Sequence, residues 1–248
     1  MYDSVTSEVI ASFCHGITNY ESSLEKCRSK FQVNLSSLLQ ENNPRILMLF
    51  WINFCAQGYG MTEPVENWIN RAGSKCKEQG YFDLGKQLCK HAIHEARHEL
   101  MMVDDTHRLV DRWNKLYSPN LDAEILLKAS YSEAVICYRD LHEDYIESET
   151  PYCQIAIEYE IENLSTTYGA ELLKHTFEIL GEDIKDALSF LDEHVRIDVA
   201  HTQFNKKVMS DFLSAYPDAL KDLINAGEKA LTIYGNFLKN CHEQAQIL

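Results

Sequence analysis

Helical periodicity constrains the fold of this chain more than any other feature of its sequence. Apolar residues recur about every 3.6 positions through long windows, and no segment alternates apolar and polar residues as a half-buried strand does. The chain has only 5 prolines and 10 glycines among 248 residues, and most of them separate the periodic segments. Those near expected helix starts are Pro44, Pro64, Pro151 and Pro217, and those near expected ends are Gly58, Gly60, Gly80 and Gly181. The sequence therefore predicts an all-α protein.

The periodic segments predict a bundle of helices without a dividing linker. Helices are expected near residues 5–28, 44–57, 62–79, 81–117, 121–147, 152–180, 183–214 and 217–245. No stretch rich in Pro, Gly and Ser interrupts them, and an apolar content of 45% suits a folded core. Residues 1–248 are therefore expected to form a single helical domain, a compact helical bundle.

The charge and the missing motifs exclude several classes of function. A formal net charge of −15 argues against binding to a nucleic-acid backbone, which requires clusters of Lys and Arg. The longest apolar stretch, residues 46–55, is too short to span a bilayer, and no secretory signal is recognisable. The sequence also lacks a P-loop, a Gly-rich dinucleotide motif and a G-x-S-x-G motif. We expect a cytoplasmic protein that binds neither nucleic acid nor membrane.

The cysteines are expected to be reduced thiols in the core. None of the eight belongs to a C-x-x-C pair, and cytoplasmic proteins rarely keep disulfides. They are Cys14, Cys27, Cys55, Cys76, Cys89, Cys137, Cys153 and Cys241. None falls on the helix faces that carry the polar residues described next, which argues against an iron–sulfur or structural zinc site.

A row of three metal-capable side chains lies in segment 183–214: His194, Asp198 and His201. Positions i, i+4 and i+7 share one face of a helix, and this face otherwise carries apolar residues such as Leu191 and Met209. With ten histidines and 38 acids in the chain, roughly 0.06 such rows are expected by chance at helical spacing. A buried charged row must be paired or must bind a metal. The alternatives are a solvated face, or core histidines satisfied by Asp198.

Segment 81–117 carries a second polar group, His91, Glu95 and His98, on its apolar face. A carboxylate and an imidazole one turn apart, as in Glu95-x-x-His98, are common in carboxylate-bridged metal sites of helical bundles. The spacing alone is a weak signal, because about 1.5 acid-x-x-His pairs are expected by chance and three occur. One of the three, Asp104 with His107, falls on the opposite face and is expected at the surface. His91 is a ligand, a partner of a ligand or a core histidine.

Segment 152–180 contributes one acid, Glu162, in the middle of its apolar face. Glu158, one turn earlier, is the reserve candidate, whereas Glu160 points away and is expected in solvent. A buried acid hydrogen-bonded to a hydroxyl is the alternative role for Glu162. Tyr159 lies one turn from Glu162 and is a candidate catalytic residue, with a place in the core or a role as hydrogen-bond donor as the alternatives.

Together these helix faces hold three carboxylates and three imidazoles. They are Glu95, His98, Glu162, His194, Asp198 and His201. Mixed oxygen and nitrogen ligation without thiolate suits iron or manganese, whereas zinc usually takes only four ligands. Six ligands suffice for two metal ions that keep open positions for O2 or a substrate.

These motifs resemble those of the haem-oxygenase-like diiron oxidases. A Glu-x-x-His pair on one helix, a single Glu on a later helix and a His-x-x-x-Asp-x-x-His row on the next look like the ligand pattern of that family. The chain length and the succession of helices are also similar, so the resemblance covers most of the chain. It is to the CADD-like proteins in particular, which include uncharacterised cyanobacterial members.

The resemblance implies a haem-oxygenase-like fold that binds two iron ions, with manganese as the alternative metal, and uses O2 to oxidise a small-molecule substrate. The Glu-x-x-His pair corresponds to the first ligand pair of the family, and the His-x-x-x-Asp-x-x-His row to its C-terminal triad. Glu162 corresponds to the later, bridging carboxylate, for which Glu158 is a competitor. His91 departs from the pattern of those relatives that place a glutamate one or two turns before the ligand histidine.

Several other functions remain open from the sequence. The same fold hosts metal-free enzymes, thiaminase II and the pyrroloquinoline-quinone synthase, which do not need this set of ligands. A non-catalytic interaction or storage protein would use the metal structurally, and haem binding would need only one or two axial ligands. No motif names the substrate, so an amino acid, a fatty acid and an aromatic precursor all fit. The apolar segment 46–55 is a candidate surface for a homodimer.

Overall fold

The computed structural model describes the backbone of residues 3–247 and the side chains of residues 16–247. All secondary structure in this part of the chain is helical, which confirms the predicted all-α class. The main helices are α1 Asp3–Leu39, α2 Pro44–Thr62, α3 Val65–Glu78, α4 Phe82–Glu95, α5 Glu99–Leu116, α6 Ala123–Leu127, α7 Glu133–Glu147, α8 Gln154–Leu164, α9 Ala170–Leu180, α10 Ser189–Ala215 and α11 Leu220–Ala245. Short 3₁₀ turns precede α8, α10 and α11, at Pro151–Cys153, Glu182–Ala187 and Pro217–Ala219.

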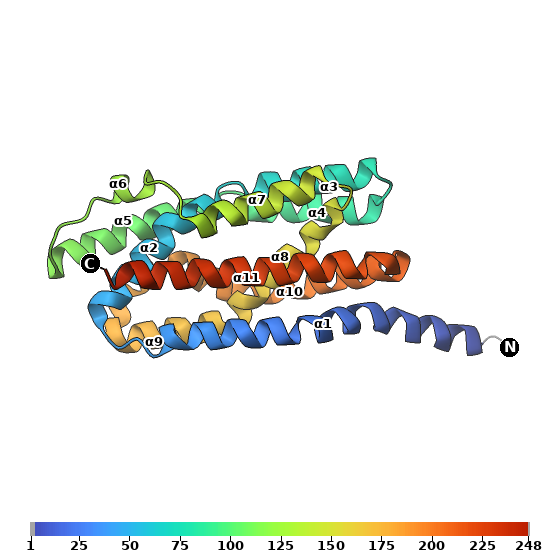
Figure 1. Cartoon of the computed structure of the whole chain (residues 1–248), viewed down its shortest axis with the longest axis horizontal. Coiled ribbons are helices and arrows are strands. Elements are labelled where there is room, and N and C mark those ends of the chain that lie inside the picture. The colour runs from blue at the N-terminus through green and yellow to red at the C-terminus, as the bar shows by residue number, and fades with distance from the viewer. Residues whose placement is uncertain (1–2, 248) are drawn as a thin grey trace.

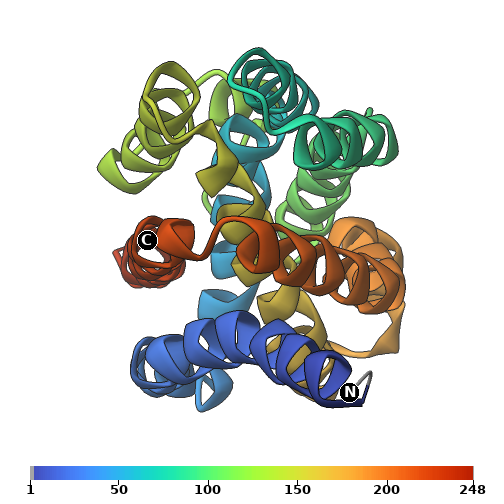
Figure 2. The same ribbon diagram turned by 90° about the vertical axis from the view of Figure 1, so that its right-hand side faces the viewer.

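Helix α8 is the central element of the bundle. Figures 1 and 2 show it crossing between the other helices, and it packs directly against α10 and α11. Every residue from 151 to 160 is buried, because apolar side chains occupy most of its surface and neighbours cover it all round. A carboxylate on such a helix has no access to bulk water, so each of its glutamates needs a partner inside the protein.

A turn of π-helix, Ser165–Gly169, joins α8 to α9. The wider turn rotates α9 relative to α8 without breaking the helical path, which is how a π-bulge inserts a residue into a helix. It begins three residues after Glu162. The predicted helix over 152–180 therefore exists as one continuous path with a local distortion next to the candidate site.

Helix α1 is longer than the predicted segment 5–28, because it continues to Leu39. The extension has a clear cause: Phe31, Leu35 and Leu38 follow the i, i+4, i+7 pattern and are all buried. Figure 1 shows α1 running alongside α11, with which it packs.

The predicted helix over 81–117 is wrong as a single element. The structure ends α4 at Glu95 and starts α5 at Glu99, and Arg97 between them has a φ of 71°. No glycine or proline marks this break, which is why periodicity alone gave one helix. The break lets α4 pack on α3 while α5 packs on α2.

Two glycines set the close packing of α3 on α4. A Cβ atom placed on Gly85 would lie 2.4 Å from the carbonyl oxygen of Gly73, and one on Gly73 would lie 2.8 Å from the carbonyl oxygen of Gly85. Because backbone meets backbone here, neither residue has room for a side chain. The contact fixes the position of α4, which carries His91 and Glu95 toward the centre of the bundle.

The predicted helix over 121–147 is also divided, into α6 and α7. Each part has its own N-cap: the Asp122 carboxylate accepts from the Glu124 backbone N–H at 2.9 Å, and Ser132 Oγ accepts from that of Val135 at 3.5 Å. The extended backbone of Ser132 at the start of α7 prevents a single continuous helix.

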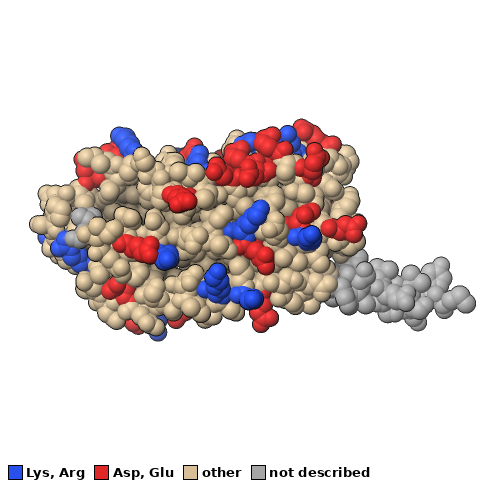
Figure 3. Space-filling model, viewed as in Figure 1, with Lys and Arg blue, Asp and Glu red and all other residues tan. Residues whose placement is uncertain are grey.

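The surface carries the expected excess of acidic side chains. Figure 3 shows acidic groups gathered over α7, among interspersed basic ones. Arg71 of α3 pairs with Glu143 and Glu147 of α7, each at 2.8 Å, so part of this charge is neutralised between neighbouring helices. No described helix has the length and apolar character needed to cross a membrane.

The apolar segment 46–55 is not an exposed surface. Its residues from Leu47 to Cys55 are buried apart from the half-buried Asn53, because α2 lies between α5 and α11. This segment therefore cannot form the suggested homodimer contact. The seven cysteines among the residues with described side chains form no disulfide, four of them are buried, and Cys14 lies outside that range.

Candidate metal centre

The start of α10 is fixed by a buried aspartate of α5 that the sequence analysis did not single out. Asp105 is fully buried and accepts hydrogen bonds from Ser189 Oγ at 2.7 Å and from the Phe190 backbone N–H at 2.9 Å. A carboxylate at this position satisfies free N–H groups of the first turn and interacts favourably with the helix dipole. It thereby fixes where along the bundle α10 places the row of His194, Asp198 and His201.

His194 is oriented by its own helix. Its Nδ1 lies 2.7 Å from the carbonyl oxygen of Phe190, so Nδ1 carries the proton and donates. Nε2 is then left unprotonated, which is the form that ligates a metal.

Two overlapping groups of donor atoms meet where α4, the α4–α5 break, α8 and α10 come together. One group is His91, Glu95, Glu162 and His201, and the other is Glu95, His98 and His194; within each group all donor atoms lie within 4.8 Å of one another. Glu95 belongs to both groups. Two ions held at these positions would therefore share one carboxylate.

The distances within the first group are short. His91 Nε2 lies 3.1 Å from Glu162 Oε1 and 3.5 Å from Glu95 Oε1. His201 Nδ1 lies 3.5 Å from Glu95 Oε1 and 3.7 Å from Glu162 Oε1. The structure thus brings His91, for which three roles were open, among the donor atoms.

The remaining predicted ligands are close to the same centre. His98 Nδ1 lies 3.1 Å from Glu95 Oε2, and the rings of His98 and His194 have centroids 4.9 Å apart. Asp198 belongs to neither donor group, but its Oδ1 lies 3.5 Å from His201 Nδ1. All six predicted ligand residues therefore lie close together, although they come from three segments spread over more than 100 positions of the sequence.

Buried polar atoms without a partner are concentrated here. Among the described residues, the buried atoms that lack a hydrogen-bond partner include His91 Nε2, Glu162 Oε1, both carboxylate oxygens of Asp198 and His201 Nδ1. Native proteins rarely leave buried carboxylate oxygens unpaired, because each costs the desolvation free energy of the group. A cation at the first donor group would satisfy the atoms of His91, Glu162 and His201, and Asp198 lies beside it, so the residues present fit a metal.

Asn205 completes the support of Glu162. It lies one turn beyond His201 on α10, is fully buried, and its Nδ2 donates to Glu162 Oε2 at 2.6 Å. The other oxygen, Oε1, is left facing the imidazoles. Because Asn205 continues the spacing of the polar row, a longer scan along the same helix face would have found it.

The pKa values of two acids in the centre are shifted in opposite directions. Burial opposes the ionisation of Glu95, but a hydrogen bond from His98 and the nearby imidazoles lower its pKa to about 2. Burial and the charges of Asp198 and Glu95 raise the pKa of Glu162 well above its usual value. The two carboxylates are thus pushed in opposite directions, a pattern found where charge is concentrated around a functional centre.

A cavity opens on one side of the centre. Its volume is about 80 Å³, and it is lined by the donor group of Glu95, His98 and His194, whereas His91 and His201 do not line it. Its walls are largely apolar, including Met61, Met102, Phe190 and Phe237, and Glu158 also lines it. Glu158 belongs to neither donor group, so its carboxylate is available to the cavity.

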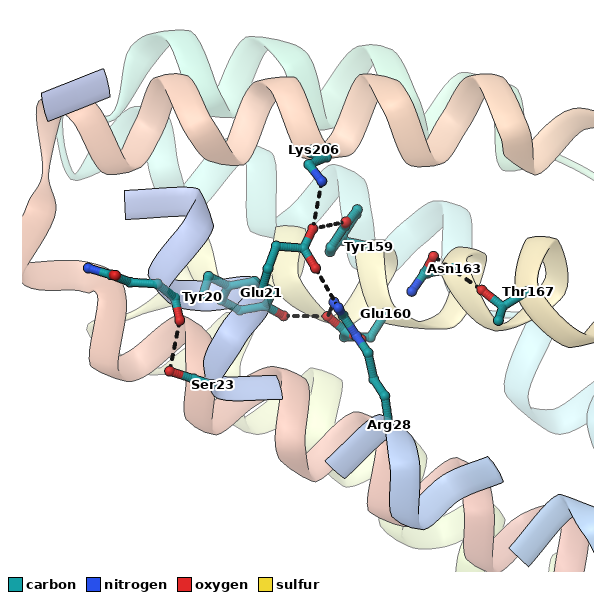
Figure 4. A network of polar contacts seen from close by, with 10 residues as sticks. Tyr20, Glu21, Ser23, Arg28, Tyr159, Glu160, Asn163, Thr167 and Lys206 are labelled. Atoms are coloured by element: carbon teal, nitrogen blue, oxygen red, sulfur yellow. Dashed lines mark hydrogen bonds and ion pairs between the residues drawn. The ribbon is translucent and has the colours of Figure 1, made fainter. Parts of the chain in front are cut away.

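The prediction that Glu160 is solvated is wrong. Its side chain is fully buried and accepts hydrogen bonds from Tyr20 at 2.9 Å and from Arg28, whose Nη2 lies 2.6 Å away (Figure 4). The face of α8 that seemed to be exposed is covered by α1, and the charge of the carboxylate is balanced by that helix. A helical wheel of α8 alone could not reveal this partner.

Tyr159 belongs to the same network and does not line the cavity. Its hydroxyl donates to Glu21, which also pairs with Lys206 at 2.9 Å (Figure 4). The predicted catalytic role of Tyr159 stays a prediction, and the placement favours its alternative as a hydrogen-bond donor. Tyr159→Phe with normal metal content and unchanged turnover would exclude the catalytic role.

Solved structures similar to this one identify the fold. A domain of unknown function with a haem-oxygenase-like fold from Shewanella denitrificans OS217 superposes with a TM-score of 0.69 and 16% sequence identity, over 100% of this chain and 94% of that one. The chain has the haem-oxygenase-like fold. A TenA homologue from Pseudomonas syringae pv. tomato DC3000 also matches, with a TM-score of 0.66 and 14% identity, over 90% of this chain and 92% of that one. No protein-family model and no curated protein sequence matches the chain.

The haem-oxygenase-like fold leaves the chemistry open. Identities of 14–16% carry the architecture but no residue roles. The functional argument for this chain therefore depends on its own buried His/Glu cluster, which could hold metal ions, and on the cavity beside it.

Proposed function

We propose that the protein is a non-haem diiron oxidase or oxygenase of the CADD-like type, which uses O2 to oxidise a small-molecule substrate. One observation carries the proposal: two donor groups of carboxylates and imidazoles, buried and joined through Glu95, surround oxygen and nitrogen atoms that have no other partner. Mixed oxygen and nitrogen ligation without thiolate suits iron, with manganese as the alternative.

The residues of this centre would have two roles: some would bind the metal ions, and others would form the walls of the cavity that holds the substrate. The ligands would be His91, Glu95, His98, Glu162, His194, Asp198 and His201. Asn205 and Asp105 orient Glu162 and the start of α10, as supporting hydrogen bonds do around metal centres. When bound, iron would supply the electrons needed to reduce O2. The apolar cavity walls would exclude water from the substrate.

The proposal is tested by loading metal and admitting O2 in separate steps. Metal-free protein is titrated with Fe(II) in the absence of air, and about two ions per chain are expected to bind. O2 is then admitted while O2 consumption and the visible spectrum are followed, with and without candidate substrates. Glu95→Gln is expected to lose both ions because both donor groups use this residue, whereas the exposed Asp104→Asn should bind iron normally. Failure of the wild-type protein to bind iron would disprove the proposal.

A metal-free enzyme of the TenA type is the second candidate, and the similarity to the TenA homologue favours it. It would use the same cavity with its carboxylic acids as proton donors and acceptors. This alternative does not explain why so many buried oxygen and nitrogen atoms of the cluster lack a hydrogen-bond partner. Turnover of a substrate that persists after complete removal of metal would support this alternative over the diiron proposal.

A further inference from the structure

Besides the hydroxyls of Thr62 and Ser165, three polar side chains that the metal centre does not use line the cavity. They are Glu158 and two tyrosines, Tyr138 of α7 and Tyr234 of α11, whose rings lie 6.4 Å apart. Neither phenol has a hydrogen-bond partner among the described residues. Buried tyrosines usually find such a partner, so these hydroxyls are available to a ligand in the cavity.

Glu158 is held in place by a buried chain of hydrogen bonds. Gln154 Nε2 donates to Glu158 Oε1 at 2.5 Å and to His142 Nδ1 at 2.9 Å. His142 is fully buried and stacks on Trp68 with ring centroids 4.1 Å apart. Burial lowers the pKa of His142 to about 4, so the ring is neutral and its Nδ1 accepts. The chain orients one oxygen of Glu158 and leaves the other to the cavity.

The charge of the cavity selects against anions. No lysine or arginine lines it, and the polar groups beyond the metal ligands are the carboxyl of Glu158, the phenols of Tyr138 and Tyr234, and the hydroxyls of Thr62 and Ser165. A carboxylate or phosphate on a ligand would find no protein cation in the cavity. An ammonium group, in contrast, donates three hydrogen bonds, and Glu158 with the two phenol oxygens offers three acceptors. The tyrosine rings add attraction for a cation.

We propose that Glu158, positioned by Gln154, binds the polar end of the substrate, and that this substrate is a primary amine on a compact apolar body. The apolar body follows from the walls formed by residues such as Met61, Val65 and Phe190. The cavity volume of about 80 Å³ suits a small ligand such as a single ring or a short chain. The proposed oxidase function is needed only for this ligand to be a substrate, because its binding is a separate property.

The test compares three ligands that share one apolar body. Benzylamine, benzyl alcohol and benzoate are titrated calorimetrically into Fe(II)-loaded protein without air, and into metal-free protein. Burial raises the pKa of Glu158 to about 8, so the titrations are run at about pH 8.5, where Glu158 is ionised and an alkylammonium still keeps its proton. Benzylamine is then expected to bind about tenfold or more tightly than benzyl alcohol in both forms, because only the ammonium makes a charge-assisted contact with Glu158. Equal affinity for the amine and the alcohol would overturn the inference.

Variants separate Glu158 from the metal ligands. Glu158→Gln is expected to abolish the preference for the amine while leaving alcohol affinity and iron content unchanged. Gln154→Met should reduce the preference several-fold with Glu158 still present, and the exposed Glu171→Gln is the matched control that should change nothing. Loss of iron in Glu158→Gln would show that Glu158 is a ligand and would overturn the inference. Failure of the wild-type protein to bind iron would instead disprove the oxidase proposal and leave the amine preference to be judged in the metal-free protein.

Discussion

At the scale of single residues, Asp198 is a buried carboxylate in the core of the candidate metal centre. Its side chain is 1% exposed and neither of its oxygens has a hydrogen-bond partner. Without metal, a buried carboxylate in this state costs about 1–3 kcal/mol. We therefore expect Asp198→Asn to raise the free energy of unfolding of the metal-free protein by about 1 kcal/mol and to weaken iron binding. Urea unfolding and iron titration measure the two effects, with Asp104→Asn as control.

This prediction is specific because Asp198→Asn is expected to increase the stability of the metal-free protein and to decrease iron affinity. A residue with a purely structural role would lose stability when substituted and would have no effect on metal. If Asp198→Asn destabilised the metal-free protein and left iron affinity unchanged, the carboxylate would belong to the core and not to the metal centre.

Arg97 stores backbone strain between the two ligand residues Glu95 and His98. Its φ of 71° lies in the left-handed region, which costs a residue with a side chain about 1–2 kcal/mol. Glycine removes this strain but loses more entropy on folding. Arg97→Gly is therefore expected to raise the free energy of unfolding by roughly 0.5–1 kcal/mol in urea unfolding. A decrease would mean that the exposed Arg97 side chain makes a stabilising contact.

The candidate ligands could be predicted from the sequence because metal-capable side chains share one helix face at regular spacing. The row from His194 to His201 lies on a core-facing stripe, where polar residues are costly. Periodicity could not decide the role of His91, because a ligand and a core histidine occupy the same face. It also misassigned Glu160, since the partner Arg28 is 132 positions away. Pairing between distant segments is not encoded in the period of either helix.

At the scale of elements, one ion pair joins α1 to the central helix. Arg28 makes two contacts with Glu160, Nε to Oε2 at 2.9 Å and Nη2 to Oε1 at 2.6 Å, and Glu160 is fully buried. Removing the cation alone leaves a buried acid unpaired, so Arg28→Met is expected to cost about 3 kcal/mol of unfolding free energy. Urea unfolding at neutral pH measures this loss.

A double-variant cycle tests the origin of that loss. Arg28→Met combined with Glu160→Gln removes the uncompensated charge and should recover part of the stability. Tyr20 can still bond to the amide of the variant, because it now bonds to Glu160 at 2.9 Å. If the losses were simply additive, the ion pair would contribute nothing to the attachment of α1.

The helices were predictable wherever the positions of proline and glycine agreed with the apolar periodicity. Pro44, Pro151 and Pro217 do begin helical segments in the structure. The break at residues 96–98 was not predictable, because no glycine or proline marks it and the apolar spacing continues on both sides. Tertiary packing of α4 on α3 and of α5 on α2 decides the break. Two candidate ligands, Glu95 and His98, therefore lie at this break.

At the scale of the whole molecule, the bundle concentrates negative charge at its centre as well as on its surface. Glu95, Glu158, Glu162 and Asp198 lie around one cavity, in a chain with a net charge of −15. The fold class followed from sequence because it depends on repeated local patterns. The cavity did not, because its lining residues come from α2, α3, α4, α5, α7, α8, α10 and α11, and only the assembled bundle brings them together.

Metal affinity of the folded protein should therefore depend on pH. The direction of this dependence is set by the protons that the ligand residues carry before metal binds. Burial raises the pKa of Glu162, a hydrogen bond to Glu95 raises the pKa of His98, and the nearby carboxylate of Asp198 raises the pKa of His201. These groups hold protons in the metal-free protein at pH values where they would otherwise have lost them, and a metal must displace those protons. Glu95, with its pKa lowered to about 2, contributes none. Affinity should thus rise with pH between roughly pH 6 and 8, by up to about tenfold per unit for each displaced proton.

Calorimetric titration of Mn(II) or anaerobic Fe(II) in two buffers with different ionisation enthalpies measures the protons released. Asn205→Leu removes the hydrogen bond that favours the ionised form of Glu162, so its pKa should rise further and the release per ion should increase near neutral pH. The exposed Asp104→Asn should match the wild-type protein. If metal binds but no protons are released at any pH, the ion lies outside the buried cluster. Binding within that cluster requires its carboxylates and imidazoles to be deprotonated.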